Sequence, residues 1–583
     1  MDISDLFKSL VIFLKAASFP EAMEGFYEEI VSVLKKKKLS KKELNRLKTK
    51  LSKKYGLRKI PTDADIILNA DPEYAEKLEL ITKPTRTLSG VAPIALMTRP
   101  HKCPHGTCIY CPGGPGSIFG DVPQSYTGRE PSTMRSARNH YDPYLVVFNR
   151  LEQFFILNQN PEKTEIIIQG GTFPSLDDKY KEEFVMYVFK AMNDFSDKFY
   201  KNNKFDFVSF KKFFELPGDI KDAERTSRVQ QKVLKLKKSS GLEKEKKRNE
   251  SSRIRCVGLT IETKPDWGLL KQGNEMLEYG CTRVELGVQA TDDRIQRFTN
   301  RGHGIKETVE STRILKDLGF KINYHMMPGL PLSSPEKDLE MLRETIENPD
   351  FKPDMFKIYP TMVLKGTALY RMWQKGKYLP MTRETAAEII SEFKRYIPRW
   401  VRIMRVQRDI PTYVTEAGVD RTNLRQYVEE KLRQKKIACR CIRCREAGLV
   451  SRKENISKII PELFVEEYEA SRGREFFISF ESRDRKVLFG YCRLRFPSQF
   501  LRKEITEGSA LLRELHVVGT ATGIGGEGNV QHRGMGKKLL EKAEKIALEN
   551  GKSKMVVISG VGVREYYRKL GYKRQGPYMA KLL

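Results

Sequence analysis

From about residue 165, short apolar runs alternate with longer segments whose apolar residues recur at helical spacing. The runs occupy residues 165–171, 255–263, 282–289, 321–329, 355–360 and 401–408. They are short and rich in Val and Ile, which is typical of parallel strands buried on both faces. Helical spacing marks the segments 292–300, 305–318 and 335–347 between them. This alternation predicts an α/β fold with a parallel TIM-like (β/α) barrel or partial barrel.

Other regions depart from this alternation. Residues 35–60 are rich in Lys and Arg with Leu at helical spacing, which predicts a basic helical extension at the N-terminus. Residues 199–253 are polar and Lys-rich, so we expect an insertion on the barrel that is partly mobile. Two alternating runs in 474–496 predict an antiparallel hairpin, and a strand, a glycine-rich turn, a helix and a strand–helix–strand unit follow. We therefore expect four parts with bounds at 1–80, 81–435, 436–460 and 461–583.

The charge of the chain points to a polyanionic partner. Its 583 residues include 106 Lys and Arg against 75 Asp and Glu, which gives a net charge of +31. Nucleic acid is the first candidate, and a solvated, Lys- and Glu-rich surface of the thermophilic kind is the alternative. No run reaches the ~20 apolar residues of a membrane span, and the first residues predict an amphipathic helix rather than a signal peptide. The nine cysteines are clustered, which favours metal binding in a reducing compartment, hence the cytoplasm.

The first cysteine group lies in "CPHGTCIYCPGG", where Cys103, Cys108 and Cys111 are separated by four and two residues. Structural zinc takes four ligands. A [4Fe–4S] cluster also usually takes four, so three thiolates predict a cluster with one iron open to another molecule. The alternative is zinc with His101 or His105 as the fourth ligand.

Several polar and glycine residues follow the predicted strands directly. A barrel places its site at the carboxyl ends of its strands, so these positions are candidates for that site. Gly170 and Gly171 end one strand, and glycine there lets backbone approach a ligand closely. Glu262, Lys264 and Asp266 in "ETKPD" end the next, and Gln289 ends the one after. Each charged residue could equally be a structural ion-pair partner.

A second candidate site opens the helix of residues 534–550. Glycines 534 and 536 precede an apolar face formed by Leu539, Leu540, Ala543, Ile546 and Ala547. Free N–H groups at such a helix start bind phosphate, and Lys537 and Lys538 add positive charge. The alternative is an ordinary helix with a glycine cap. A "GKS/T" ending is absent, which excludes a P-loop.

A third group, Cys439, Cys441 and Cys444, lies in a basic stretch beyond the last predicted barrel strand. The C-x-C-x-x-C spacing predicts a metal site, most simply zinc, with a fourth ligand that we do not assign. A second iron–sulfur cluster is the alternative. Cys256, Cys281 and Cys492 lie in apolar strand patterns and are expected in the core.

These motifs resemble two enzyme families. The three-cysteine loop with the Gly170–Gly171 turn resembles the radical S-adenosylmethionine enzymes, although the usual cysteine spacing there is three and two. That resemblance implies cofactor binding by Gly170, Gly171, Glu262 and Gln289, with Lys264 in the reaction. "QHRGMGKK" and "REYYRKLGY" resemble the acetyl-CoA loop and final helix of GNAT acetyltransferases. This second resemblance implies acetyl-CoA binding by Gln531, Arg533, Gly534, Met535, Gly536 and Lys537. It also makes Glu514 a candidate base and Tyr566 or Tyr567 the group that orients the thioester or protonates the leaving thiolate.

The combination, from about residue 80 onward, resembles the family of Elongator catalytic subunits in its archaeal form. "MPGLP", "KIYPT", "RVQRDIP" and "CRCIRCRE" also match that family. The resemblance implies conversion of the tRNA wobble uridine to 5-carboxymethyluridine. A 5′-deoxyadenosyl radical would take hydrogen from the acetyl methyl of acetyl-CoA, the carbon radical would add to carbon 5 of the base, and thioester hydrolysis would leave the carboxymethyl group.

The same resemblance implies a [4Fe–4S] cluster, S-adenosylmethionine and acetyl-CoA as cofactors, beside the zinc predicted from the spacing of Cys439, Cys441 and Cys444, and it implies the anticodon stem-loop of tRNA as partner. Basic residues in 35–60, together with Arg433, Lys435, Lys436, Arg440 and Arg443, would hold its phosphates. No membrane partner is expected, and a homodimer and accessory subunits stay open. The alternative function is a protein lysine acetyltransferase in which the iron–sulfur barrel is structural or regulatory. The basic charge argues against it, because a cleft for Lys-rich tails should be acidic.

Overall fold

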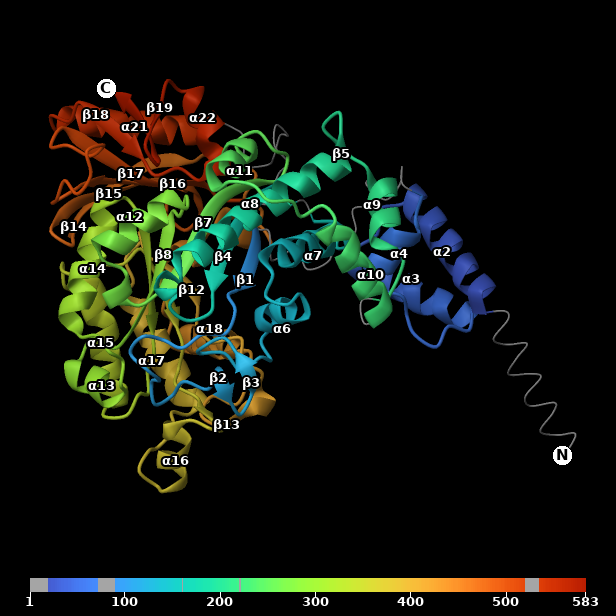
Figure 1. Ribbon diagram of the computed structural model, residues 1–583, viewed down its shortest axis with the longest axis horizontal. Coiled ribbons are helices and arrows are strands. Elements are labelled where there is room, and N and C mark those ends of the chain that lie inside the picture. Colours follow the sequence, from blue (N-terminus) through green and yellow to red (C-terminus); the bar gives the residue numbers. More distant parts are fainter. Residues whose placement is uncertain (1–18, 72–89, 160, 220–221, 520–533) are drawn as a thin grey trace, which may run out of the picture. The chain divides into compact units, whose positions relative to one another are not determined.

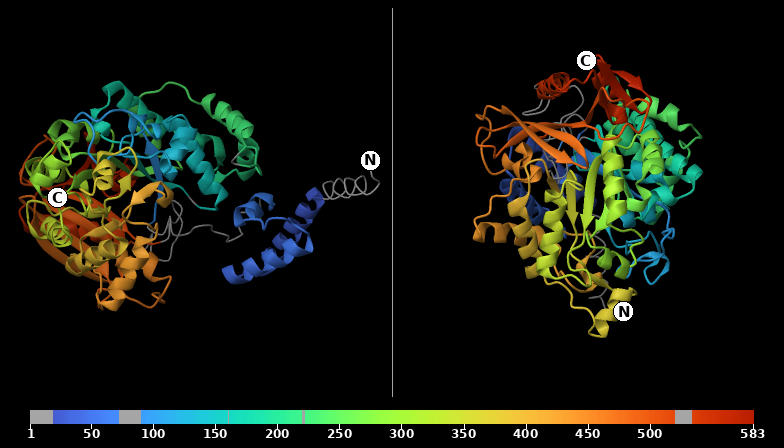
Figure 2. Two further views of the ribbon diagram at one scale, coloured as in Figure 1. Left: turned by 90° about the horizontal axis from the view of Figure 1, so that it is seen from below. Right: turned by 90° about the vertical axis from the view of Figure 1, so that its left-hand side faces the viewer.

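The computed structural model describes residues 19–71, 90–159, 161–219, 222–519 and 534–583, shown in Figures 1 and 2. Contacts divide the chain into two units. The first comprises residues 1–85, 148–161 and 195–238, and the second comprises 86–147, 162–194 and 239–583. Within the described residues no helix is both long and apolar enough to cross a bilayer.

The first unit begins with three helices, α2 (Phe19–Lys36), α3 (Lys41–Lys54) and α4 (Asp63–Asn69). Helix α3 starts at a capping box, in which the Glu43 N–H donates to the Ser40 hydroxyl and the Ser40 N–H donates to the Glu43 carboxylate. Leu44 and Leu51 form its buried face, whereas Lys42, Arg46 and Lys50 are exposed. The sequence prediction of a basic helix in 35–60 is therefore confirmed for α3.

The insertion of residues 199–253 folds into defined elements. It contains a short hairpin, β5 (Tyr200–Lys201) and β6 (Lys204–Phe205), followed by α9 (Phe207–Phe214), α10 (Ala223–Leu234) and α11 (Leu242–Asn249). Part of it shares a ring cluster with α7 (Pro143–Ile156) and the end of α8 (Asp178–Phe199). The cluster consists of Phe155, Phe195, Phe199, Phe205, Phe210 and Phe214. The rings of Phe155 and Phe205 stack with their centroids 3.9 Å apart, so aromatic packing supplies a local core in a polar sequence.

The second unit contains a parallel sheet in the order β1-β4-β7-β8-β9-β10-β12. Its strands are β1 (Ala92–Met97), β4 (Lys163–Gln169), β7 (Arg255–Thr263), β8 (Arg283–Gln289), β9 (Lys321–Met326), β10 (Met355–Ile358) and β12 (Arg402–Arg405). Every neighbouring pair is parallel, and β1 and β12 form the two edges. The predicted partial barrel is confirmed. Strand β1 is an addition that the hydrophobic pattern did not reveal.

Helices on the outer side connect these strands (Figure 1). They are α12 (Leu270–Glu278), α14 (Ile305–Asp317), α15 (Pro335–Glu347) and α17 (Arg383–Tyr396). The segments predicted as helical at 305–318 and 335–347 correspond to α14 and α15, and residues 292–300 contain α13 (Asp293–Phe298). Cys256 and Cys281 are buried, as expected. Successive side chains of each strand point alternately to the helices and into the barrel.

A second sheet, ordered β14-β15-β16-β17-β18-β20-β19, follows in the chain. Its strands are β14 (Glu462–Ala470), β15 (Gly473–Glu481), β16 (Leu488–Phe496), β17 (Ser509–Val517), β18 (Lys554–Val557), β20 (Tyr578–Leu582) and β19 (Lys573–Gln575). Strands β14 to β17 are antiparallel, which confirms the predicted hairpin, and β17 pairs with β18 in parallel. Helix α21 (Met535–Glu549) buries its predicted apolar face on this sheet.

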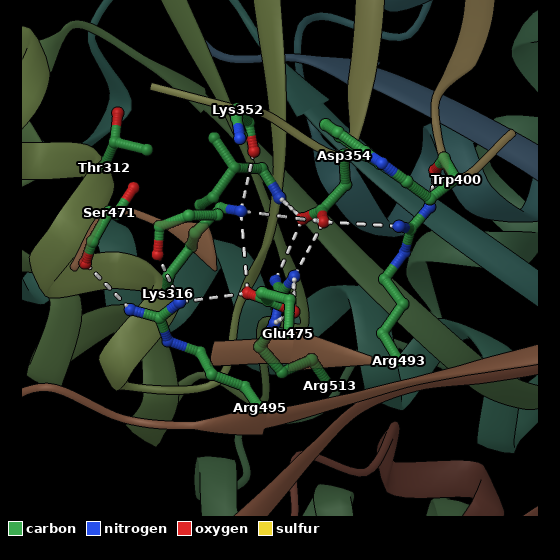
Figure 3. A network of polar contacts seen from close by, with 12 residues as sticks. Thr312, Lys316, Lys352, Asp354, Trp400, Ser471, Glu475, Arg493, Arg495 and Arg513 are labelled. Carbon is green, nitrogen blue, oxygen red and sulfur yellow. Dashed lines mark hydrogen bonds and ion pairs between the residues drawn. The ribbon is translucent and has the colours of Figure 1, made fainter. Parts of the chain in front are cut away.

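Buried ion pairs join the second sheet to the amino end of the barrel strands (Figure 3). Arg493, Arg495 and Arg513 come from the sheet, and all three are fully buried. They meet Asp317, which ends α14, and Asp354, which precedes β10. Buried charges require such partners because their desolvation is costly. The network therefore fixes the sheet at this end of the barrel.

Candidate functional site

The three-cysteine loop follows strand β1 and lies at the carboxyl ends of the barrel strands. Cys103, Cys108 and Cys111 are all buried. Their sulfur atoms contact polar groups, which are Thr172 Oγ1 at 3.6 Å from Cys103, Arg301 Nη1 at 3.6 Å from Cys108 and Ser125 N at 3.2 Å from Cys111. Burial raises the pKa of the Cys103 thiol and that of the Cys111 thiol, the latter to about 11, and these donors offset burial only in part. Thiolate ligation at this loop therefore depends on a bound metal to replace the protons.

The spacing of these sulfur atoms suits a cluster better than a single ion. In the part of the chain that the structure describes, the atoms of Cys439, Cys441 and Cys444 all lie within 4.8 Å of one another, whereas those of Cys103, Cys108 and Cys111 do not form such a set. His105 lies near, with its Nε2 at 3.2 Å from the Cys108 sulfur, but it completes no such set either. One tetrahedral zinc ion needs its ligands close together. The first trio is therefore arranged for a larger body such as an iron–sulfur cluster.

The Gly170–Gly171 turn lies against this loop. Both residues have positive φ angles, +122° and +101°. A Cβ on Gly171 would lie 3.6 Å from the Cys103 sulfur and 3.6 Å from the His101 ring, and one on Gly170 would collide with Thr98. Both positions favour glycine because of their positive φ, and at Gly170 the collision with Thr98 excludes any side chain as well. Backbone groups are thus exposed beside the cysteines, as the sequence predicted.

A cavity of about 110 Å³, here named the carboxyl-end cavity, lies next to this loop. Cys103, Gly171, Glu262, Lys264 and Gln289 all line it, so the structure brings together these five of the residues that the sequence assigned to one site, whereas Cys108, Cys111 and Gly170 are not among its lining residues. The side-chain oxygen of Gln289 is buried there and has no hydrogen-bond partner among the residues that the structure describes. A buried acceptor of this kind can bind an N–H or O–H group of a ligand, which fits the ammonium and hydroxyl groups of S-adenosylmethionine.

Glu262 and Lys264 differ in their surroundings. The Glu262 carboxylate accepts hydrogen bonds from Tyr126 Oη at 3.0 Å, Gln169 Nε2 at 2.9 Å and Lys357 Nζ at 3.1 Å. Lys264 is buried and pairs with Asp266 at 3.1 Å. Burial, followed by the charge of Arg301, lowers the pKa of the Lys264 ammonium. Glu262 is thus held rigidly by three donors, and Lys264 forms the ion pair that the sequence left as an alternative.

A second cavity, about 730 Å³ and here named the amino-end cavity, lies at the opposite end of the barrel. Its walls come from the amino ends of barrel strands, from β17, and from α21 and α22 (Arg564–Arg568). The predicted residues Glu514, Gly534, Met535, Gly536, Lys537, Tyr566 and Tyr567 all line it. Gln531 and Arg533 lie outside the described residues. The helix start of α21 therefore faces this cavity, with Gly534 in the left-handed conformation at φ +75°.

The two tyrosines have different environments. Tyr566 is 37% exposed, and its hydroxyl lies 3.1 Å from the position that a Cβ on Gly536 would take. Tyr567 is 5% exposed and packs in the core of the second sheet. Burial raises the pKa of Tyr566, so its hydroxyl keeps its proton at neutral pH and can donate a hydrogen bond. Tyr566 is the better placed of the pair for chemistry in the cavity.

Glu514 is an ion-paired carboxylate. Its oxygens accept hydrogen bonds from Arg493 Nε at 2.8 Å and Tyr491 Oη at 3.0 Å. Burial would raise its pKa, but the charges of Arg493, Lys321 and His516 outweigh burial and lower it to about 2. A general base works best with a pKa near the working pH. The surroundings of Glu514 therefore favour a fixed negative charge over proton transfer.

The third cysteine group lies in the loop between barrel and second sheet. The three sulfur atoms are close enough for one ion, and Lys394 Nζ lies 3.6 Å from the Cys444 sulfur. Cys439 and Cys441 are mostly covered, whereas Cys444 is exposed. This geometry fits a single tetrahedral ion such as zinc.

The sequence reasoning missed a set of charged residues inside the barrel. Glu285, His325 and Lys357 lie on three successive strands, and Glu262, Glu285 and His325 bring their ligand atoms within 4.8 Å of one another. Lys357 Nζ contacts both carboxylates. Its ammonium group therefore already balances the negative charge that a metal ion would otherwise neutralise. The signal was present, because every second residue is polar in strands that otherwise look fully buried.

Comparison with known proteins identifies three matching regions. Residues 226–342 match the Radical SAM superfamily, residues 353–434 the Radical SAM C-terminal domain, and residues 23–88 the ELP3 N-terminal domain. The tRNA uridine(34) acetyltransferase of Methanocaldococcus jannaschii is 45% identical over 559 residues, which cover 94% of this chain and 95% of the relative. The human Elongator complex protein 3 is 39% identical over 552 residues, covering 93% of each chain.

A solved structure agrees with these matches. The archaeal Methanocaldococcus infernus Elp3, with residues 1–46 deleted, is 39% identical and superposes with a TM-score of 0.69. It covers 85% of this chain, and all of that structure is matched. The similarity therefore extends over both the barrel and the second sheet.

Proposed function

Because the chain belongs to the family of tRNA uridine(34) acetyltransferases and Elongator complex protein 3, we propose that it modifies the wobble uridine of tRNA. The product would be 5-carboxymethyluridine, made from acetyl-CoA with S-adenosylmethionine as the second co-substrate. The observation that carries this proposal is the cysteine loop, which lies beside the Gly170–Gly171 turn at the carboxyl end of a parallel barrel. The second cavity at the other end supplies a place for an acyl donor.

At the carboxyl-end cavity, Cys103, Cys108 and Cys111 would hold a [4Fe–4S] cluster. When bound, such a cluster supplies the electron for reductive cleavage of S-adenosylmethionine. The chain itself would position that ligand. The backbone of Gly171 can approach it, the Gln289 amide can bind a polar atom of it, and the rigidly held Glu262 can accept its hydroxyl protons.

At the amino-end cavity, we propose that residues 461–583 act as a GNAT-type acetyl-CoA domain. In support of this, the parallel pair β17–β18 follows four antiparallel strands, and α21 begins with a glycine turn beside the cavity. The N–H groups of that first turn can bind a phosphate of coenzyme A. The Tyr566 hydroxyl would donate to the thioester carbonyl or to the leaving sulfur.

The tRNA partner is supported by charge. Lys42, Arg46 and Lys50 form an exposed row on α3, spaced one turn apart, in a chain of net charge +31. Such a row can follow phosphates. All nine cysteines are free, which agrees with a cytoplasmic location. A lysine acetyltransferase remains the second candidate, because a GNAT-type cavity could serve either acceptor.

The test is to incubate iron-reconstituted protein with tRNA, acetyl-CoA, S-adenosylmethionine and dithionite, and to analyse wobble nucleosides by mass spectrometry. We expect 5-carboxymethyluridine with the wild type, none with Cys108→Ala, and near-normal amounts with Cys281→Ala, because Cys281 is a core residue. Acetylation of lysine peptides by iron-free protein, with no nucleoside product, would support the alternative function instead.

A further inference from the structure

We propose that the barrel interior is a gated passage through which an acyl thioester held in the amino-end cavity reaches the carboxyl-end cavity. This inference rests on the proposed function, since it assigns a route to the acetyl group of that reaction. The gate consists of Arg283, which lines the amino-end cavity, and Glu285, which lines neither cavity and lies between them.

The two cavities lie at opposite ends of one interior space. On strand β8, Arg283 lines the amino-end cavity, whereas Gly287 and Gln289 line the carboxyl-end cavity. On strand β9, Lys321 lines the first and His325 the second. These positions differ by even numbers of residues, so all point into the barrel. At a rise of ~3.3 Å per residue, Arg283 and Gly287 are ~13 Å apart, which an extended thioester arm can span.

The layer between the cavities is polar and charged. Glu285 and Asn323 are completely buried, and Lys357 is 5% exposed. Charges of alternating sign connect one cavity to the other: Arg283 lies 2.6 Å from Glu165 and 3.5 Å from Glu285. Lys357 then pairs with Glu285 and, at 3.1 Å, with Glu262. A continuous ladder of ion pairs therefore runs through the barrel.

Stability alone does not explain this ladder. The interior of a parallel barrel is usually filled by branched apolar side chains, and replacing buried ion pairs by apolar residues is often neutral or stabilising. Several polar atoms in the ladder also lack hydrogen-bond partners among the described residues, namely Arg283 Nη2, Glu285 Oε1 and Asn323 Oδ1. Unsatisfied buried groups are costly. They can, however, serve a polar guest, because Arg283 Nη2 can donate to a thioester carbonyl and the two oxygens can accept from amide N–H groups of an acyl-carrying arm.

The contacts suggest how the passage opens. Arg283 holds Glu165 at the short distance of 2.6 Å and Glu285 at the longer distance of 3.5 Å. Release of the longer contact would leave Arg283 with Glu165 at the wall of the amino-end cavity. Glu285 would keep Lys357 and His325, the latter at 2.9 Å. Only the contact between Arg283 and Glu285 would then break, and each of the two side chains would keep a partner of opposite charge.

Blocking the passage should reduce product formation and leave the partial reactions at the two cavities intact. Asn323 lies in the middle layer, with its Nδ2 3.3 Å from Met404 Sδ, so Asn323→Leu and the larger Asn323→Phe should obstruct it. We expect nucleoside product to fall at least tenfold, while tRNA-stimulated acetyl-CoA hydrolysis and reductive cleavage of S-adenosylmethionine each stay within about twofold. Tyr324→Phe is the matched control, because Tyr324 points away from the interior toward Thr312.

Full product formation by both Asn323 variants would overturn the passage. Absence of both partial reactions in the wild type would instead overturn the proposed function.

Independent evidence comes from Asn323→Cys, probed by methyl methanethiosulfonate and peptide mass spectrometry. We expect the new thiol to be modified and acetyl-CoA to slow its modification at least fivefold, with Tyr324→Cys unreactive. An Asn323→Cys thiol that stays unmodified while the thiol of a Lys545→Cys variant, at an exposed position, reacts fully would contradict a passage that small molecules can enter.

Discussion

The guanidinium of Arg513 forms two parallel hydrogen bonds to the carboxylate of Asp354, at 2.7 and 2.9 Å, and so joins the second sheet to the start of strand β10. Both residues are fully buried. Arg513 also contacts Glu475 at 2.9 Å. Within the interface network, Arg513 therefore serves two carboxylates, Asp354 of the barrel and Glu475 of its own sheet.

Arg513→Met should destabilise the protein strongly. It leaves Asp354 and Glu475 short of positive charge, and breaking a buried pair costs about 3–5 kcal/mol. The free energy of unfolding in urea measures this loss. Lys545→Met is the control, because its pair with Glu549 is exposed and is worth less than about 1 kcal/mol. Equal effects of the two variants would mean that the buried network does not hold the domains together.

Tyr566→Phe should slow acetyl-CoA hydrolysis about 100-fold by removing a hydrogen-bond donor from the reacting thioester. The KM for acetyl-CoA should change little, because the change affects kcat. Tyr567→Phe, in the core, should stay within about threefold in rate and should alter the melting temperature instead. The reverse ranking of the two rates would assign the chemistry to Tyr567.

Glu514→Gln should lower the free energy of unfolding by up to about 3 kcal/mol at pH 7, since one pKa unit corresponds to about 1.4 kcal/mol. The native pKa lies below the ordinary value of 4.5, so this stabilisation is complete above pH 4.5 and disappears as the pH falls toward 2. Urea titrations at pH 3 and pH 7 should therefore show a smaller difference at pH 3. Between pH 5 and 9, the pH profiles of acetyl-CoA hydrolysis by the wild type and by Glu514→Gln should have the same shape. An inflection present only in the wild type would show that Glu514 acts as a base.

Cys441→Ser should abolish binding of about one zinc ion per chain, measured by mass spectrometry of the metal. Iron content should be unaffected, because Cys103, Cys108 and Cys111 form a separate group. Cys492→Ala is the control, since Cys492 is buried in the second sheet. Loss of iron rather than zinc on Cys441→Ser would indicate a second iron–sulfur cluster.

Replacing Lys42, Arg46 and Lys50 together by Gln should weaken tRNA binding and reduce its dependence on salt. Each lost phosphate contact lowers the slope of log affinity against log salt by ~0.7–0.9. Filter binding at several salt concentrations measures both quantities. Replacing exposed Lys545, which has an acidic partner, should leave the slope unchanged. An unchanged slope in the triple variant would exclude α3 from the interface.

The sequence predicted the barrel well because its strands are buried apolar runs separated by helices of regular period. Strand β1 was missed, since "APIALM" is a short run beside many polar residues and contains Pro93, which weakens a strand prediction. Its parallel pairing with β4 depends on residues about 70 positions further along the chain. Contacts of that kind cannot be read from a local pattern.

In the candidate sites, too, features set by a local sequence pattern were predicted, whereas features set by contacts between distant strands were not. Cysteine spacing and glycine turns are local, so the sequence identified both cysteine groups and the Gly170–Gly171 turn, while their metals stay predictions. Lys357, Glu285 and His325 meet only because three strands pair in a particular register. The different roles of Tyr566 and Tyr567 likewise depend on which face of α22 packs on the sheet, and two adjacent tyrosines carry no sequence signal for that choice.

The phenylalanine cluster of the insertion affects the order of folding. Strands β4 and β7 are neighbours in the sheet, although β4 ends at Gln169 and β7 begins at Arg255. Bringing such distant segments together is slow because loop closure costs entropy. The rings between Phe195 and Phe214 are close in sequence, so they can collapse early and shorten the effective loop. The bulky aromatic residues would then speed assembly of a barrel to which they contribute no strand.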